Sequence, residues 1–328
     1  MDNAYYILAE KQIEIERLHI CTWEFPSESS YIEFGVEFSY ENFSENTLTL
    51  LLAAPFIKTN SPVTCLLKNL SDSANGRFIF NDVVCGIDNV GDDSRDGSIL
   101  KFERREKLTI LPCAIDVKDG IITFVVNKPN RHEGNLYFRV LIKLEDSSVA
   151  IKKSGIAQTT YIYDFKINET RNLPQEIYDI KKNHRLKICK VNNVFCLHAI
   201  PDNFAFSFVD SSKLKNIRKL ETSAFQQYLP EVKGISKDCY NIMFLKDSEK
   251  ESYSLFSICN EETIGSRQIA LAVGANILCS LLFAFSALRF VKDPTIEWYK
   301  QIPWEYWGAF AILIILCIYL FTPLKKKL

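Results

Sequence analysis

Two long stretches without a charged side chain, near the C-terminal end, constrain this chain most strongly. Residues 269–288 read IALAVGANILCSLLFAFSAL, and residues 306–324 read YWGAFAILIILCIYLFTPL. A helix of about 20 residues is about 30 Å long, which matches the hydrocarbon core of a bilayer. Pro294 and Pro303 discourage one continuous helix across both stretches. The sequence therefore predicts a C-terminal two-helix transmembrane hairpin with a basic tail over residues 267–328.

The charges beside these stretches predict the orientation of the hairpin. Arg267 precedes the first stretch and the cluster 325–327 (KKK) follows the second, so both lie on one side of the bilayer. Positive charge favours the cytosolic side. Residues 1–20 lack the basic segment followed by an apolar segment that would export the preceding region. We therefore expect a multi-pass membrane protein with two spans and with both termini in the cytosol.

The region before the hairpin has an alternation of apolar and polar side chains that is typical of β-strands. In residues 31–40, YIEFGVEFSY, every second residue from Ile32 to Tyr40 is apolar, and the residues between them are polar or glycine. This period of two predicts a strand with one buried face. We expect a mainly β cytosolic domain over 1–150, an antiparallel sandwich or barrel. Further strands are predicted at residues 47–54, 77–84, 100–111, 120–126, 136–144 and 160–167.

A few short helices are predicted after residue 150. Pro174 suits the first position of a helix in PQEIYDIKKN. Leu214, Ile217 and Leu220 stand near helical spacing behind two serines, which predicts a helix from about residue 213 to 229. The segments VFCLHAI, FAFSFVD, NIMFLKD and SYSLFSIC read as strands. We therefore expect a basic α+β cytosolic region and connector over 151–266.

Charge is distributed unevenly along the cytosolic part. Residues 1–151 contain 15 Lys and Arg against 23 Asp and Glu, a difference of −8, whereas residues 152–220 contain 13 against 6, a difference of +7. Such a basic region can bind an anionic ligand, for example a nucleotide or an oligonucleotide. The simpler alternative is a solvated face that complements the acidic half of a neighbouring subunit. The candidate anion-binding residues are Lys181, Lys182, Arg185, Lys187, Lys190, Lys213, Lys215, Arg218 and Lys219.

The motifs of the common enzyme classes are absent from the sequence. It contains no GxxxxGK[ST], GxGxxG, HExxH or GxSxG pattern. The best metal candidates are His184, Cys189, Cys196 and His198, because thiolates and imidazoles bind zinc, but their spacing fits no standard zinc pattern. We therefore expect no enzymatic activity, no catalytic residue, no metal site and no cofactor.

One apolar stretch carries a polar pair. Asn276 and Ser280 are four residues apart and share one helix face with Phe283. An amide that faces lipid is costly, so Asn276 should face a partner helix or a water-filled lumen. Four or more copies of the chain could enclose a pore lined by Asn276, Ser280 and Phe283. The alternative is that these residues only hold a helix hairpin or a dimer together.

A cytosolic β-rich domain followed by two terminal spans, with the polar stripe of Asn276 and Ser280, resembles the membrane effectors of bacterial anti-phage signalling systems. This resemblance covers the layout of the whole chain and includes cyclic-oligonucleotide systems and the Hailong type. It implies a bacterial inner-membrane location and a homo-oligomeric, signal-gated ion channel or pore. The cytosolic domain would sense a nucleotide signal, an oligonucleotide or a protein trigger in antiviral defence. The alternative is a non-conducting membrane-anchored scaffold or recognition module for a cytosolic partner enzyme.

Overall fold

The computed structural model divides the chain into two compact units. The first unit comprises Met1–Ser154 and Thr159–Glu261, and the second comprises Gly155–Gln158 and Glu262–Leu328. The structure describes residues 4–24, 29–54, 57, 61–118, 120–144, 149–155, 158–171, 173–220, 226–230, 232, 240–248, 250–262, 266–289 and 303–321.

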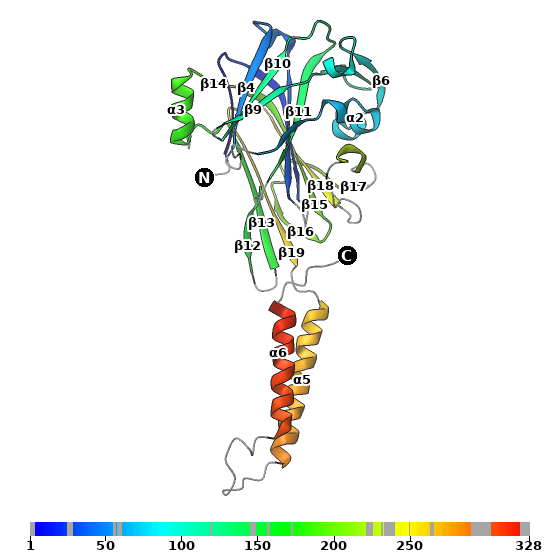
Figure 1. The fold of residues 1–328 in the computed structure, drawn as a ribbon, viewed down its shortest axis with the longest axis vertical. Coiled ribbons are helices and arrows are strands. Elements are labelled where there is room, and N and C mark those ends of the chain that lie inside the picture. The colour runs from blue at the N-terminus through cyan, green and yellow to red at the C-terminus, as the bar shows by residue number, and fades with distance from the viewer. Residues whose placement is uncertain are drawn as a thin grey trace. The chain divides into compact units, whose positions relative to one another are not determined.

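The first unit contains two large β-sheets (Figure 1). In the nine-stranded sheet the order is β16 (Phe204–Val209), β19 (Tyr253–Glu262), β13 (Gln158–Ile167), β1 (Ala4–Ala9), β4 (Thr47–Ala53), β10 (Ile121–Asn127) and β9 (Ala114–Lys118), while β12 (Ile151–Ser154) pairs with β13 and β14 (Lys187–Ile188) pairs with β1. In the ten-stranded sheet the order is β17 (Leu214–Leu220), β18 (Tyr240–Ser248), β15 (Lys190–Pro201), β2 (Glu14–Trp23), β3 (Tyr31–Phe38), β11 (Asn135–Lys143), β8 (Leu108–Ile110), β7 (Ser98–Phe102) and β6 (Val84–Asn89), while β5 (Val63–Cys65) pairs with β11.

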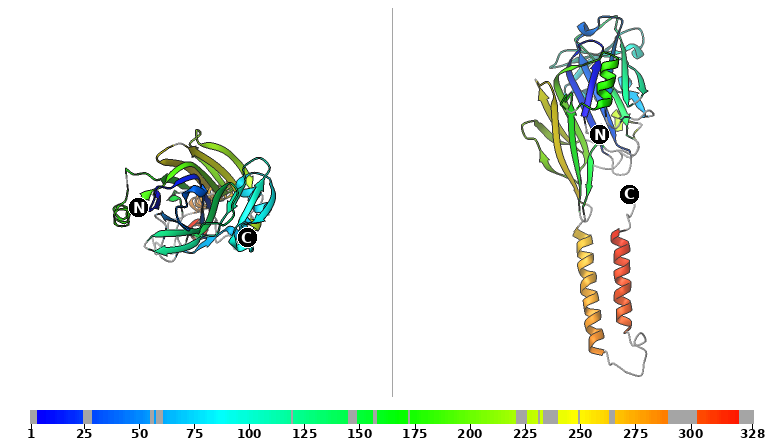
Figure 2. Two further views of the ribbon diagram at one scale, coloured as in Figure 1. Left: turned by 90° about the horizontal axis from the view of Figure 1, so that it is seen from above. Right: turned by 90° about the vertical axis from the view of Figure 1, so that its left-hand side faces the viewer.

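The main hydrophobic core contains inward-facing residues of both sheets, which makes the unit a β-sandwich (Figure 2). The alternation in β3 directs Ile32, Phe34, Val36 and Phe38 into this core, as the sequence predicts. The predicted antiparallel arrangement is wrong in part, because three strand pairs among the described residues are parallel: β1 with β13, β11 with β8, and β15 with β2. Parallel pairing joins strands that are far apart in the sequence, and local turn patterns do not reveal such pairs.

Short helices pack on the outer faces of both sheets. Residues of α1 (Leu67–Leu70) and α2 (Ser73–Phe80) form a second core with the ten-stranded sheet. Helix α3 (Gln175–Asn183) places Ile177 and Ile180 against a smaller cluster on the nine-stranded sheet. Figure 1 shows α2 and α3 on opposite sides of the sandwich. Two single-turn 3₁₀ helices, η1 (Tyr40–Asn42) and η2 (Ser94–Asp96), lie between strands.

Two predicted elements have the wrong type. The predicted strand at 77–84 begins inside α2, because the Asp72 side chain accepts hydrogen bonds from the backbone of Ala74 and Asn75 and starts a helix there. Over residues 214–220 the predicted helix at 213–229 is wrong, because these residues form β17, whose backbone pairs with β18. Residues 226–228 are helical as predicted, and residues 221–225 lie outside the described residues. Ile217 is 40% exposed, so the apparent helical face does not pack on the core. Pairing with an existing sheet has overridden the local pattern.

The second unit contains two long helices, α5 (Ser266–Arg289) and α6 (Trp304–Phe321), which lie side by side (Figure 2). Within the described residues, no helix is both long enough and apolar enough to cross a membrane.

This finding contradicts the predicted transmembrane hairpin. It also contradicts the expectation that the protein is located in a membrane with two spans, and the expectation that it forms a membrane channel or pore. The prediction depended on the length of the two stretches and on their absence of charge. Asn276, Ser280 and Ser286 interrupt the apolar sequence of α5, and α6 begins with Trp304 and Glu305.

Candidate ligand-binding site

A cavity of about 230 Å³ lies on the outer face of the ten-stranded sheet. Strands β2, β11, β15, β17 and β18 contribute to its lining, together with the end of α2 and the loop after β7. Its lining combines cations with apolar and aromatic side chains: Arg17, His19, Cys21, Ile79, Phe80, Asn81, Arg105, Arg139, Phe195, Leu197, Lys215, Phe244 and Leu245.

The strand register brings the lining residues into rows. Alternation along β2 directs Arg17, His19 and Cys21 to the same face of the sheet. In the register of β15 with β2, Phe195 stands opposite His19, and Leu197 stands opposite Cys21. Residues opposite one another on neighbouring strands have adjacent side chains. The cavity floor is therefore a direct result of strand pairing.

A glycine in β3 opens the floor beside His19. Gly35 is the register partner of His19 on β2 and of Arg139 on β11. A Cβ atom at this position would overlap the phenol group of Tyr137. Because no side chain is present, the Tyr137 hydroxyl can approach both His19 Nδ1 and Arg139 Nη1, at 3.0 Å from each.

The cations of the cavity outnumber the carboxyl groups that pair with them. Arg17 and Arg105 share a single partner, Glu37, with nitrogen to oxygen distances of 3.7 and 3.4 Å. Arg139 pairs with Glu33. Lys215 forms no ion pair with any residue that the structure describes. Among the described residues, four cations therefore face two carboxyl groups, an excess of two positive charges.

Exposure of the cations changes from the cavity mouth to its floor. The side chain of Arg17 is 40% exposed, that of Arg105 is 19% exposed and that of Arg139 is 1% exposed. Arg105 also lies over the ring of Phe80, at 5.1 Å from its centroid. This cation–π contact and the ion pair with Glu37 hold the guanidinium at the wall of the cavity.

The buried partner of Arg139 is the centre of a polar network. Glu33 is fully buried and accepts hydrogen bonds from Trp23 Nε1, from Arg139 Nε and from the Tyr228 hydroxyl, the last at 2.6 Å. Arg139 Nη2 also donates to Cys21 Sγ at 2.7 Å. Buried charges are tolerated when they are paired and hydrogen-bonded in this way. The network therefore fixes Arg139 at the floor.

Three titratable groups beside Arg139, namely His19, Cys21 and Tyr137, are uncharged at neutral pH. Burial, and then the charges of Arg139, Arg105 and Arg17, lower the pKa of His19 well below its ordinary value. Burial raises the pKa of Cys21 to about 12 and that of Tyr137 also to about 12. A neutral imidazole, a thiol and a phenol beside fixed guanidinium groups favour recognition of an anion over nucleophilic chemistry.

The basic residues singled out in the sequence lie on different sheets. Lys181 and Lys182 lie in α3 and Arg185 follows it, whereas Lys187 lies in β14 of the nine-stranded sheet and Lys190 begins β15 of the ten-stranded sheet. The other four lie at or next to β17 at the edge of the ten-stranded sheet. Several are paired: Lys190 with Glu14 at 2.7 Å, and Lys219 with Asp202 at 3.6 Å. Of the nine, Lys215 lines the cavity.

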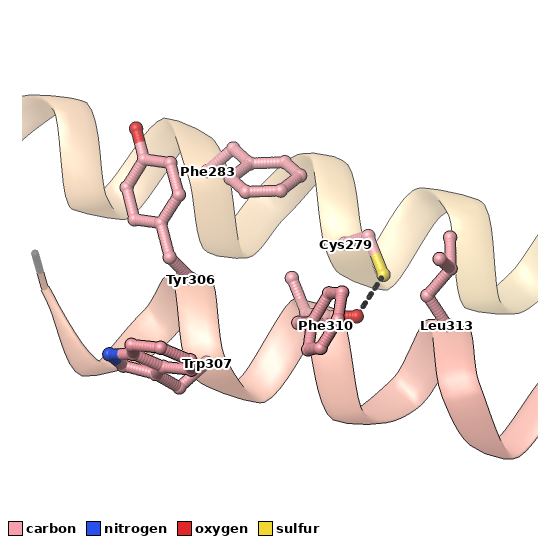
Figure 3. Close-up of a pocket in the computed structure, with 7 residues that line it drawn as sticks. Cys279, Phe283, Tyr306, Trp307, Phe310 and Leu313 are labelled. Atoms are coloured by element: carbon pink, nitrogen blue, oxygen red, sulfur yellow. Dashed lines mark hydrogen bonds between the residues drawn. The ribbon is translucent and has the colours of Figure 1, made fainter.

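The residues that we expected to line a pore lie on α5. Asn276 and Ser280 are exposed, and the Ser280 hydroxyl donates to the Asn276 carbonyl oxygen at 2.9 Å. Phe283 lies against Tyr306 of α6, with ring centroids 4.9 Å apart. An apolar cavity of about 400 Å³ lies between the two helices, where Cys279 Sγ is 3.6 Å from the Ala309 carbonyl oxygen. Figure 3 shows Phe283 and Cys279 among the side chains that line it.

The four zinc candidates are not assembled into a metal site. Within the described ranges, no group of three or more His, Cys, Asp or Glu residues could hold a metal ion. His184 is exposed at the end of α3, whereas Cys196 and His198 are buried in β15. His198 Nδ1 lies 2.7 Å from the Thr22 hydroxyl, and burial lowers the pKa of His198 to about 3.

Most of the cavity residues were missed in the sequence. Arg17, His19 and Cys21 stand at every second position, but this period alone does not show that other segments cover their face of the strand. The pattern at 77–84 predicts Phe80 in a strand, whereas Phe80 ends α2. The chain matches no known protein family, and the search of curated proteins found no similar sequence.

Proposed function

We propose that the β-sandwich is a recognition module that binds a small organic phosphate in the cavity of Arg17, Arg105, Arg139 and Lys215. The observation that carries this proposal is the excess of two positive charges around an apolar cavity of about 230 Å³. A phosphomonoester carries between about 1.5 and 2 negative charges at neutral pH, which matches this excess.

The geometry of the cations supports a phosphate in particular. Arginine presents several N–H donors in a plane and forms paired hydrogen bonds with phosphate oxygens. Arg17 and Arg105 have Glu37 as a shared carboxylate, so donors of both guanidiniums remain for a ligand. The volume lies below the about 300–1,000 Å³ of sites for drug-sized ligands, so the ligand is compact.

This proposal retains the sensing part of the function expected from the sequence. It places the ligand in a different location from the five basic residues between Lys181 and Lys190, because four of these five side chains are exposed and all five lie outside the cavity. The proposed function includes no channel, because no described helix can cross a membrane.

Calorimetric titration of the full chain with a panel of compounds tests the proposal. The panel contains ribose 5-phosphate, the nucleoside 5′-monophosphates and the corresponding nucleosides. We expect phosphorylated members to bind and their unphosphorylated counterparts not to bind. Arg105→Gln should weaken binding by about 10- to 150-fold, because a hydrogen bond to a charged group contributes about 1.5–3 kcal/mol.

A matched arginine provides the control. Arg171→Gln removes a guanidinium that is 86% exposed and lies outside the cavity, so it should not change the affinity. In the Arg105→Gln variant, Glu37 keeps Arg17 and the Asn135 amide as partners, so the fold should persist, and thermal unfolding checks this. Equal affinity of the Arg105→Gln variant and the wild type, or no binding by any phosphate, would contradict the proposal.

A further inference from the structure

We propose that His19 is a specificity-determining residue that donates a hydrogen bond from Nε2 to an uncharged acceptor on the organic part of the ligand. The ligand in this inference is the one in the proposed binding function, on which the inference rests. The tautomer of His19, by contrast, follows from the protein alone. It is derived from a chain of three hydrogen-bonding groups at the cavity floor.

The first step is the direction of the bond between Arg139 and Tyr137. A guanidinium has donors and no acceptor, so Arg139 Nη1 donates to the Tyr137 hydroxyl oxygen at 3.0 Å. Tyr137 is fully buried, so its own hydroxyl proton also needs a partner. In the described part of the chain, the remaining polar atom that bonds to this hydroxyl is His19 Nδ1, at 3.0 Å.

The second step follows from that proton. Because the Tyr137 hydroxyl donates to His19, Nδ1 is the accepting nitrogen of the ring. A neutral imidazole carries its one proton on the other nitrogen, which is Nε2. The opposite tautomer would leave a buried phenol proton without an acceptor, a costly arrangement. Arg139 and Tyr137 therefore act as positioning residues that hold His19 in one tautomer.

The third step concerns what this donor faces. His19 lines the cavity, and no hydrogen bond joins its Nε2 to another described residue. Phe195 lies edge-on to the His19 ring, with centroids 5.3 Å apart, and Phe80 lies at 6.4 Å. The His19 ring that carries this donor is therefore flanked by aromatic side chains of the cavity lining. A ring nitrogen or a carbonyl oxygen suits such a position better than a phosphate group does.

Nitrogen-15 NMR of histidine-labelled full chain tests the tautomer without any ligand. The His19→Gln variant identifies the His19 signals by their absence. We expect Nδ1 of His19 to have the shift of an unprotonated nitrogen and Nε2 that of a protonated one. In Tyr137→Phe the tautomer preference should be lost, because the phenol proton is removed. A proton on Nδ1 in the wild type, or an unchanged preference in Tyr137→Phe, would overturn the inference.

Binding of two probes tests the role of His19 in specificity. Adenosine 5′-monophosphate has ring acceptors, whereas ribose 5-phosphate has the same phosphate without them. We expect His19→Phe to weaken binding of the nucleotide by about 5- to 150-fold, the range for an unpaired polar group, and to leave ribose 5-phosphate unchanged. An equal loss for both probes, or no loss for the nucleotide, would overturn the inference while the phosphate proposal stands. If the wild type binds no phosphate compound, the proposed function is contradicted. The NMR measurement then still decides which tautomer His19 adopts.

Discussion

The substitution Glu33→Gln tests the polar network beneath the cavity most sharply. The amide has nearly the same shape as the carboxylate but no charge. Glu33 is 0% exposed and its partner Arg139 is 1% exposed, so Glu33→Gln leaves a buried guanidinium without its counter-ion. The hydroxyl of Tyr228 and the indole of Trp23 also lose a charged acceptor.

The expected loss is large because water does not reach either charge. Breaking a buried pair by removing one partner costs about 3–5 kcal/mol, a considerable part of the about 5–15 kcal/mol that stabilises a typical domain. For a unit of this size, such a loss lowers the melting temperature by about 6–20 °C. Replacing both members, as in Glu33→Gln with Arg139→Met, should be less damaging than Glu33→Gln alone, since no uncompensated charge remains.

Urea unfolding followed by circular dichroism of the β-sheet measures these differences. Glu45→Gln is the matched control, because Glu45 belongs to an exposed pair with Lys11 at 3.2 Å and should contribute at most about 1 kcal/mol. If Glu33→Gln were as stable as the wild type, or if the double variant were less stable than Glu33→Gln, the proposed network would be refuted.

Two further predictions concern other buried groups. The folded-state pKa of His198 is about 3, below the about 6.5 of an unfolded chain, so stability is complete above pH 6.5 and falls as the pH decreases towards 3. Between pH 7.5 and 5, His198→Gln should reduce the loss of unfolding free energy, measured with urea, by about 2 kcal/mol. The control His184→Gln, at an exposed position, should show the same loss as the wild type. If the unfolding free energy of His198→Gln fell with pH as steeply as that of the wild type, the prediction would be wrong. Gly35→Ala should cost about 1–3 kcal/mol in the same measurement, because Tyr137 must move, and a variant as stable as the wild type would disprove the close approach.

The strands with a clear period of two could be predicted from the sequence. The alternation that predicts β3 also holds in the structure, because one face of that strand packs on the main core. Predicted segments at 47–54, 120–126 and 136–144 likewise correspond to β4, β10 and β11. Helix α3 was predicted from Pro174, which the structure places immediately before the first helical residue.

The candidate site could not be predicted, because its residues come together only through long-range pairing. Glu33 and Glu37 occupy the polar face of β3, which the sequence assigns to solvent, yet they are 0% and 3% exposed. Their partners include Arg139 and Arg105, on distant segments. A carboxylate in a strand indicates a buried ion pair only when the neighbouring strand is known.

A structure of the full chain with adenosine 5′-monophosphate bound tests the central claim most directly. The account predicts the phosphate among Arg17, Arg105 and Lys215, and the base beside His19. A nucleotide bound at the lysines of α3, or no nucleotide on the outer face of the ten-stranded sheet, would contradict it.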